Sequence, residues 1–148
     1  MPDCVYCTSP EIRERAIVRE TLVWAFPTNI PIVPGHVLVA PVRHMEKFID
    51  LTRKERDAFF DLAMRLRPTL SELFGAEGFH FAWNEGAVAG QSVPHLHLHM
   101  VPRKAGDAGV VEHDPRRFLY RPGSREATPE AELQAVSKSI KEKLRDGK

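Results

Sequence analysis

Three histidines alternate with apolar residues in the segment His95-Leu96-His97-Leu98-His99. Side chains of a β-strand alternate between its two faces, so a strand over residues 95–101 places three imidazoles on one face, roughly 6–7 Å apart. Leu96, Leu98 and Met100 fall on the other face, where they anchor the strand in a core. Neutral imidazole is a nucleophile near pH 7, since its ordinary pKa is about 6.5. The row therefore favours nucleophilic catalysis, in which attack on phosphorus divides one difficult displacement into two easier ones.

Two other interpretations of this row stay open. A polar strand face exposed to solvent would carry histidines without chemistry, although such faces usually mix residue types. A catalytic metal site also suits His-x-His on a strand. The residues after His99 are Met100, Val101, Pro102 and Arg103, so no carboxylate follows to complete a mixed ligand set.

The elements that position this row are predicted from hydrophobic spacing. Strands are expected over residues 16–18, 22–26, 36–40, 79–83 and 95–101, and a long helix from Thr52 to Gly75. Thr52 and Glu55 have the spacing of a capping box, and Pro68 is expected to kink or divide the helix. A last helix begins after an N-cap at Thr128, with Pro129 as its first residue. The pattern predicts the α+β class, with a five-stranded antiparallel sheet and helices on one side.

The composition fits one domain over residues 1–148, with a core over about 4–104, an irregular segment over 105–127 and the C-terminal helix over 128–146. The formal net charge is +1, so no charge excess indicates a nucleic acid or a membrane surface as a partner. No apolar run approaches the length of a membrane span, and the first residues lack a signal-peptide pattern. We therefore expect a cytoplasmic protein.

Three segments together resemble the histidine triad (HIT) family of nucleotide hydrolases and transferases. They are residues 90–101 (GQSVPHLHLHMV), residues 34–41 (PGHVLVAP) and residues 84–86 (NEG). The likeness spans most of residues 4–103. It implies a five-stranded antiparallel sheet that pairs as a homodimer. It also implies an enzyme acting on a nucleotide substrate of the adenosine or guanosine type.

The resemblance implies a role for each matching position. His97 is similar to the nucleophile that becomes nucleotidylated on the α-phosphate, and His99 and His36 to the histidines that contact phosphate and orient it. Ser92 and Gln91 resemble contacts to the phosphate and the leaving group, and Asn84 a position that steadies the phosphate end. Phe26 and Leu38 fall where the family builds its base pocket.

One position departs from the family pattern. Where the family usually has Asp or Asn to bind the ribose hydroxyls, eight residues before His36, this chain has Thr28, followed by Asn29. The ribose contact is expected from one of these two residues. Residues 101–107 (VPRKAGD) resemble the fragile-histidine-triad branch, which cleaves dinucleoside polyphosphates.

The only two cysteines form the pair Cys4-Val5-Tyr6-Cys7. In a reducing compartment this spacing suggests metal or redox chemistry, although no predicted strand precedes the pair as a redox fold requires. The pair resembles the zinc-bearing bacterial members of the family, which implies that Cys4, Cys7, His44 and His95 bind zinc. Two thiolates and two imidazoles make a closed, structural site, so zinc is not required for the chemistry. A loose cysteine pair with His44 on the surface is the other interpretation.

These observations predict an enzyme that attacks the α-phosphate through a covalent nucleotidyl-histidine intermediate. The substrate class covers nucleoside polyphosphates, dinucleoside polyphosphates and nucleotide phosphoramidates. The alternatives are a nucleotide-binding signalling module with little turnover and a metal-dependent hydrolase that uses the triad as ligands. Phe60 and Met64 widen the apolar surface of the long helix beyond one face, and a contact between subunits would explain the excess.

Overall fold

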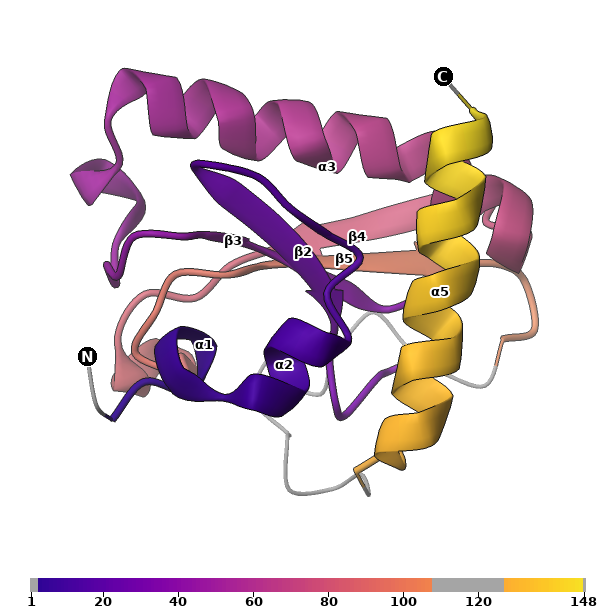
Figure 1. Cartoon of the computed structure of the whole chain (residues 1–148), viewed down its shortest axis with the longest axis horizontal. Coiled ribbons are helices and arrows are strands. Elements are labelled where there is room, and N and C mark those ends of the chain that lie inside the picture. Colours follow the sequence, from indigo (N-terminus) through magenta and orange to yellow (C-terminus); the bar gives the residue numbers. More distant parts are fainter. Residues whose placement is uncertain (1–2, 108–126, 148) are drawn as a thin grey trace.

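A five-stranded antiparallel sheet forms the centre of the computed structural model, which describes residues 3–107 and 127–147. The strand order is β1-β2-β3-β5-β4 (Figure 1). The strands are β1 (Val18–Arg19), β2 (Val23–Pro27), β3 (Val37–Pro41), β4 (Gly78–Ala82) and β5 (Leu98–Arg103), and every neighbouring pair is antiparallel. The predicted α+β class and five-stranded sheet are confirmed.

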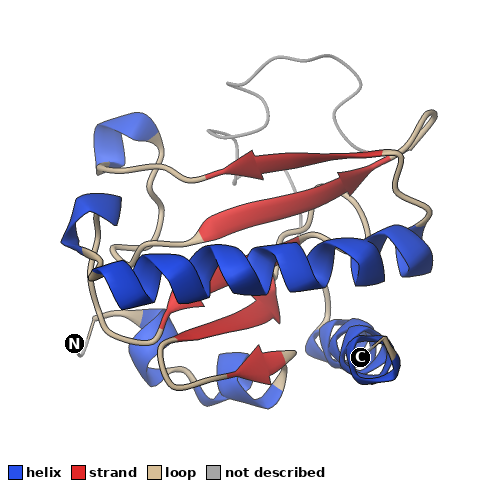
Figure 2. Cartoon of the chain, turned by 90° about the horizontal axis from the view of Figure 1, so that it is seen from above, coloured by secondary structure: helices blue, strands red, loops and turns tan. Residues whose placement is uncertain are grey.

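The helix α3 (Arg53–Phe74) covers one face of the sheet (Figure 2). The predicted capping box is present, because the Thr52 and Glu55 side chains each accept a hydrogen bond from the other residue's backbone N–H. Gly75 ends the helix in the left-handed conformation, at φ 65°. The prediction that Pro68 divides the helix is wrong. Pro68 has no N–H, so the Met64 carbonyl lacks its helical hydrogen bond, and Met64 lies on the exposed side of the helix. Leu66 and Leu70, which are buried before and after Pro68, hold both halves of the helix against the core.

The C-terminal helix α5 (Glu130–Asp146) stands across the end of α3 and extends toward the opposite side of the sheet (Figures 1 and 2). Lys143 pairs with Glu72 of α3, while Leu133 and Ile140 are buried. Its predicted start is wrong by one residue, since Pro129 takes the N-cap position. The reason is that the Thr128 N–H donates to the Asn29 carbonyl at 2.8 Å, which holds Thr128 in the preceding loop.

Two short helices cover the other face of the sheet, so the expectation of helices on one side is wrong. They are α1 (Val5–Thr8) and α2 (Pro10–Glu14), which lie on the opposite side of the sheet from α3 (Figure 1). Tyr6 and Ile12 pack there with Trp24 and Phe26 in a second core cluster. Neither helix is long enough to produce a periodic pattern in the sequence.

The histidine segment enters the sheet later than predicted. Strand β5 begins at Leu98, and the N–H of Leu96 donates at 2.7 Å to the carbonyl of Met45, which lies outside the sheet. The alternation itself is confirmed, because Leu96, Leu98 and Met100 belong to the core cluster under α3. His99 pairs with Leu38 of β3 in register, on the side of the second cluster.

The remaining elements are two 3₁₀ turns, η1 (Phe48–Asp50) and η2 (Ala87–Ala89), which lie in the loops beside the histidine segment. Within the described residues, no helix has the length and apolar character needed to cross a membrane. The predicted irregular segment over 105–127 falls mainly on residues 108–126, outside the described residues.

Candidate active site and metal centre

His97 is held in one tautomer by the backbone. Its Nδ1 lies 2.8 Å from the carbonyl oxygen of His95, and a carbonyl only accepts, so Nδ1 carries the proton and donates. The lone pair of the neutral ring is therefore on Nε2. Only 6% of His97 is exposed, and burial lowers the pKa of its imidazole below the ordinary value. A buried, neutral imidazole with a fixed tautomer is a suitable nucleophile near pH 7.

His36 and His99 form a relay of hydrogen bonds beside His97. The Ile32 N–H donates to His36 Nδ1 at 3.1 Å, so a neutral His36 carries its proton on Nε2. His36 Nε2 lies 2.9 Å from His99 Nδ1 and donates to it, which leaves the proton of a neutral His99 on its own Nε2. The ring centroids of His99 and His97 are 5.1 Å apart. The two hydrogen bonds thus fix the tautomers of a neutral His36 and His99, and the ring of His99 lies beside that of His97.

A cavity of about 490 Å³ opens onto these histidines. Among the predicted site residues, its wall contains His97, His99, His36, Ser92, Phe26, Leu38, Thr28 and Asn29. The wall therefore combines a polar end of imidazoles and a hydroxyl with apolar surface from β2 and β3. This volume and mixture are typical of a site for a small organic ligand with a polar head.

Asn84 and Gln91 are two predicted substrate contacts that the structure does not bring into this wall. The Asn84 side-chain amide donates to the Gly90 carbonyl at 3.1 Å. Gln91 accepts from the Gly86 N–H at 2.7 Å and donates to the Glu46 carbonyl at 3.1 Å. Both side chains hold the loop that carries Ser92, so here they act on the shape of the loop.

Tyr6, Arg15 and Glu130 also line this cavity, and the sequence did not mark them as site residues. Tyr6 packs its ring edge-on against His97, with centroids 5.3 Å apart, and burial raises the pKa of its phenol. Arg15 and Glu130 form an ion pair at 2.8 Å across 115 positions of sequence. Arg15 is an ordinary charged residue in an N-terminal segment, and no local pattern indicates that it is buried beside a C-terminal helix.

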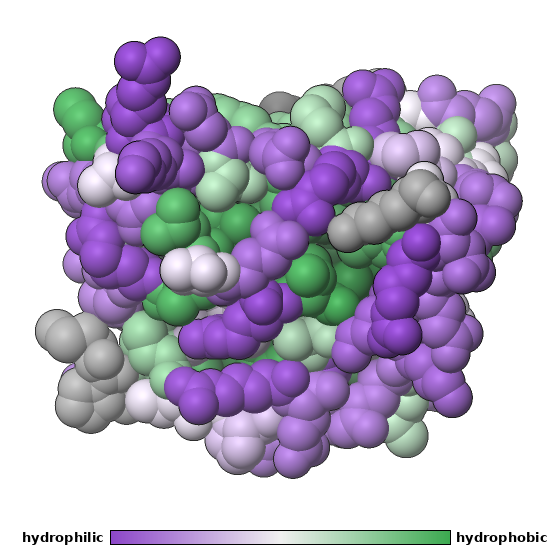
Figure 3. Space-filling model, turned by 45° about the horizontal axis from the view of Figure 1, so that its top comes forward, coloured by the Kyte–Doolittle hydropathy of each residue, from purple (hydrophilic) through white to green (hydrophobic). Residues whose placement is uncertain are grey.

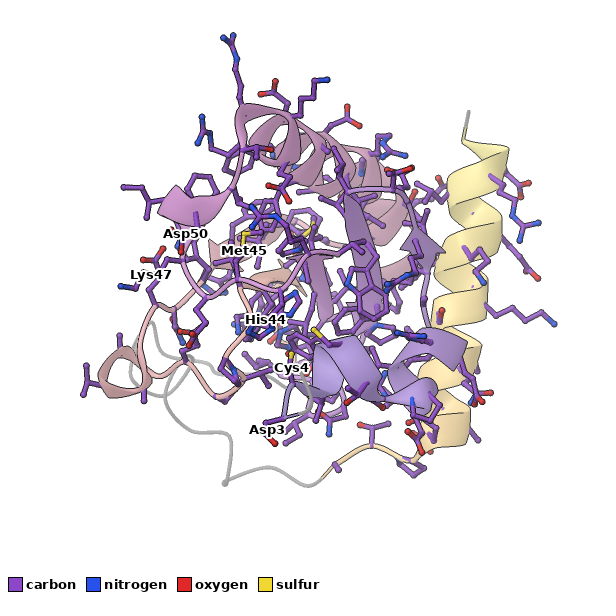
Figure 4. The ribbon with its side chains drawn as sticks, turned by 60° about the vertical axis from the view of Figure 1, so that its left-hand side comes forward. Asp3, Cys4, His44, Met45, Lys47 and Asp50 are labelled. Carbon is purple, nitrogen blue, oxygen red and sulfur yellow. The ribbon has the colours of Figure 1, made fainter. Side chains whose placement is uncertain are left out.

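The four predicted metal ligands come together between α1, β3 and the histidine segment. Cys4 Sγ and Cys7 Sγ lie 3.3 and 3.6 Å from His95 Nδ1, and Cys7 Sγ lies 3.5 Å from His44 Nδ1. All four ligand atoms lie within 4.8 Å of one another. Figure 4 shows Cys4 and His44 close together, where the N-terminal segment approaches the segment after β3.

The orientation of His95 suits a metal ligand. Its Nε2 donates to the Pro41 carbonyl at 2.8 Å, which leaves the Nδ1 lone pair facing the two sulfurs. Burial lowers the pKa of His95 to about 4, so the ring is neutral at pH 7. Tetrahedral zinc with bonds of about 2.3 Å to sulfur and 2.0–2.1 Å to nitrogen sets sulfur and nitrogen about 3.5 Å apart. The sulfur–nitrogen distances here match that value, so the donor set fits zinc.

Comparison with known proteins agrees with this geometry. The HIT domain matches residues 9–106 of the chain. The chain belongs to the HIT family. A bis(5′-nucleosyl)-tetraphosphatase (asymmetrical) of Schizosaccharomyces pombe is 35% identical over 107 residues, which cover 72% of this chain and 59% of the relative. A bis(5′-adenosyl)-triphosphatase of Dictyostelium discoideum is 42% identical over 77 residues, 52% of each chain. This HIT protein thus spans between half and three fifths of the length of these relatives.

The fold matches solved HIT structures over almost the whole chain. A zinc-bound histidine triad family protein from Mycobacterium smegmatis superposes with a TM-score of 0.72 and 25% identity, covering 99% of both chains. The resemblance to the HIT family that the three sequence segments carried is therefore confirmed, together with the five-stranded antiparallel sheet that it implies.

Proposed function

We propose that this HIT protein hydrolyses the phosphate chain of a nucleotide at the α-phosphorus, with His97 as the nucleophile. The observation that carries the proposal is the state of His97. Its Nδ1–H is tied to the His95 carbonyl, its Nε2 keeps a lone pair, and the residue lines a cavity that Ser92 and His99 also line. Burial keeps the ring neutral, which is the reactive form.

The reaction consists of two displacements at one phosphorus. His97 Nε2 forms a bond to the α-phosphorus while the bond from that phosphorus to the bridging atom breaks, and the leaving group departs with a proton. The ring of His99 lies beside that of His97, so His99 would donate a hydrogen bond to a phosphate oxygen, and the leaving group takes its proton from solvent. Water then attacks the phosphorus, the bond to Nε2 breaks, and a nucleoside monophosphate is released while the second water proton passes to solvent.

The substrate class is proposed from chemistry and from the relatives' names. A dinucleoside polyphosphate offers an α-phosphorus for attack, a phosphoanhydride-linked leaving group and a nucleoside for the apolar part of the cavity. Both relatives above are named for such substrates. Phe26 and Leu38 provide apolar surface for a purine, and Ser92 provides a hydroxyl for the phosphate end. A nucleoside polyphosphate or a nucleotide phosphoramidate presents the same reacting phosphorus.

Zinc bound by Cys4, Cys7, His44 and His95 completes the proposal as a structural ion. Four protein ligands close the coordination sphere, so the ion has no open position for water or substrate. Its contribution would be to tie the N-terminal segment to the residue two positions before the nucleophile. The His95 carbonyl, which fixes the tautomer of His97, belongs to one of these ligands.

We also propose that the protein is a homodimer through the side of the molecule that carries β4. This strand ends the sheet, and the apolar side chains Phe60, Met64, Phe81 and Trp83 are each 40–50% exposed. Phe48 stacks on Trp83 and also contacts Phe60, which joins α3 to the end of β4. Figure 3 shows apolar patches interrupted by hydrophilic residues on one face of the molecule. A second copy would bury the apolar surface and pair the edge strand.

The test is a panel of substrates incubated with purified protein, with products identified by mass. The panel contains diadenosine and diguanosine polyphosphates, adenosine triphosphate and an adenosine phosphoramidate. The proposal predicts a nucleoside 5′-monophosphate as one product in every productive reaction, and no turnover by His97→Ala. Release of only inorganic phosphate, or equal turnover by the variant, would contradict it.

A further inference from the structure

The cavity extends beyond the HIT domain match, and its far wall comes from the C-terminal helix. Ala127, Thr128 and Glu130 line it together with Thr28 and Asn29, whereas the family match ends at residue 106. Glu130 is the first residue of α5. The helix is thus placed to contribute a side chain to ligand binding as well as to pack against α3.

Arg15 positions the Glu130 carboxylate beside residue 28. Arg15 is 5% exposed, its Nε donates to the Pro27 carbonyl at 3.1 Å, and its Nη1 donates to Glu130 Oε1 at 2.8 Å. The Thr128 N–H donates to the Asn29 carbonyl. Two independent links therefore join the start of α5 to the segment 27–29, on either side of Thr28.

The second carboxylate oxygen is left without a donor. Glu130 Oε2 is enclosed and has no hydrogen-bond partner among the residues that the structure describes. An enclosed acceptor of this kind costs free energy, and the cost is larger for a charged group. The side chain as a whole is 35% exposed and lines the cavity, so a ligand hydroxyl can supply the missing donor after a small rotation of the carboxylate.

Two other side chains in this part of the wall, those of Thr28 and Glu11, already accept hydrogen bonds from protein groups. The Thr28 hydroxyl accepts from the Ile30 N–H at 3.4 Å, and Glu11 accepts from the Ser9 hydroxyl at 2.9 Å. A nucleoside with its phosphate at the histidines and its base on Phe26 and Leu38 carries its two neighbouring ribose hydroxyls between them. Carboxylates are well suited to accept hydrogen bonds from ribose hydroxyls.

We propose that Glu130 accepts a hydrogen bond from the ribose hydroxyls of the bound nucleotide, and that Arg15 is its positioning residue. The inference rests on the proposed function, because it requires a nucleotide in this cavity. It makes the C-terminal helix a determinant of the sugar that the site accepts, with preference for ribose over a sugar without hydroxyls.

The test measures binding of a nucleoside 5′-monophosphate and of its 2′,3′-dideoxy analogue by calorimetry. The adenosine and guanosine forms are both tried, and the one that wild type binds more tightly is used. Glu130→Gln keeps the size of the side chain and leaves Arg15 an acceptor, but it places an amide donor where Oε2 was. We expect the ribonucleotide to bind on the order of tenfold to a hundredfold more weakly to the variant, and the dideoxy analogue to bind equally to both proteins.

Glu132→Gln is the matched control, since it removes the same charge from an exposed position in the same first turn of α5. It should leave both affinities unchanged. Equal weakening of both nucleotides by Glu130→Gln would mean that Glu130 acts only through the fold and would overturn the inference, while the proposed function would stand. No change with either nucleotide would also overturn it. If wild type binds neither monophosphate, both the inference and the proposed function fail.

Discussion

Replacement of Glu55 by Gln should destabilise the protein in a way that depends on pH. Only 4% of the Glu55 side chain is exposed, and its carboxylate accepts from the Thr52 N–H at 2.9 Å and from Arg43 at 2.8 and 3.1 Å. The Arg43 guanidinium, followed by the bonds from Thr52, lowers the pKa of Glu55 from 4.5 to about 2. The pair joins the start of α3 to the residue before His44, so it also supports the proposed metal centre.

The magnitude follows from that pKa. One pKa unit corresponds to about 1.4 kcal/mol, so the full difference corresponds to about 3 kcal/mol. Arg43 is half exposed, and solvent screening reduces the expected loss of unfolding free energy to about 2 kcal/mol at pH 7. A carboxyl whose pKa is lowered by folding stabilises the protein above its ordinary pKa and loses that contribution as the pH falls through the folded value. The difference between wild type and Glu55→Gln should therefore shrink between pH 5 and pH 2.

The assay is urea denaturation followed by circular dichroism at pH 7, 5, 4 and 3. Asp57→Asn is the control, because Asp57 is an exposed carboxylate in the same helix, and it should change the unfolding free energy by less than about 0.5 kcal/mol. A loss for Glu55→Gln that is the same at every pH would refute the reasoning, since it would assign the effect to packing and not to the charge.

Three further outcomes are expected. His97→Ala should lower kcat by on the order of a thousandfold or more at unchanged circular dichroism, because the nucleophile is lost; residual activity near that of wild type would exclude its role. Cys4→Ser should reduce the zinc content measured by atomic emission from one ion per chain and lower Tm; wild type purified without chelator and free of zinc would contradict the metal centre. Met64→Glu, which adds a charge at a half-exposed position, should convert a dimer to a monomer in sedimentation velocity at unchanged secondary structure; a variant that stays dimeric would move the interface elsewhere.

The core strands and the long helix were predictable because their signals are local. Short apolar runs identify β2 and β3, and alternation of histidine with apolar residues identifies β5. The Thr52–Glu55 pair marks the start of α3 within one turn. The triad was predictable for the same reason, since His97 and His99 lie two residues apart in one segment with the side-chain alternation of a strand. The metal cluster was predicted as a complete set, and its members are Cys4, Cys7, His44 and His95. Cys4 and His95 lie 91 positions apart in the sequence. The resemblance to the HIT family grouped these residues, which their spacing alone could not do.

The parts that were not predicted depend on contacts between distant segments. The short helices α1 and α2 are formed because Tyr6 and Ile12 pack on β2, and four- or five-residue helices leave no periodic signal. The ion pair of Arg15 with Glu130 arises only when α5 docks beside α2. The Leu96 N–H bonds to Met45 and not to a neighbouring strand, which delays the start of β5 although the side-chain alternation is that of a strand.

In the proposed mechanism the α-phosphorus undergoes two displacements, first by His97 and then by water. The most direct measurement is the stereochemical course at the α-phosphorus, with a dinucleoside polyphosphate made chiral there by one sulfur and hydrolysed in oxygen-18 water. Each in-line displacement inverts the configuration, so two displacements restore it. We expect a nucleoside monophosphate product with retained configuration. Inverted configuration would contradict it, because water would then have attacked the phosphorus directly.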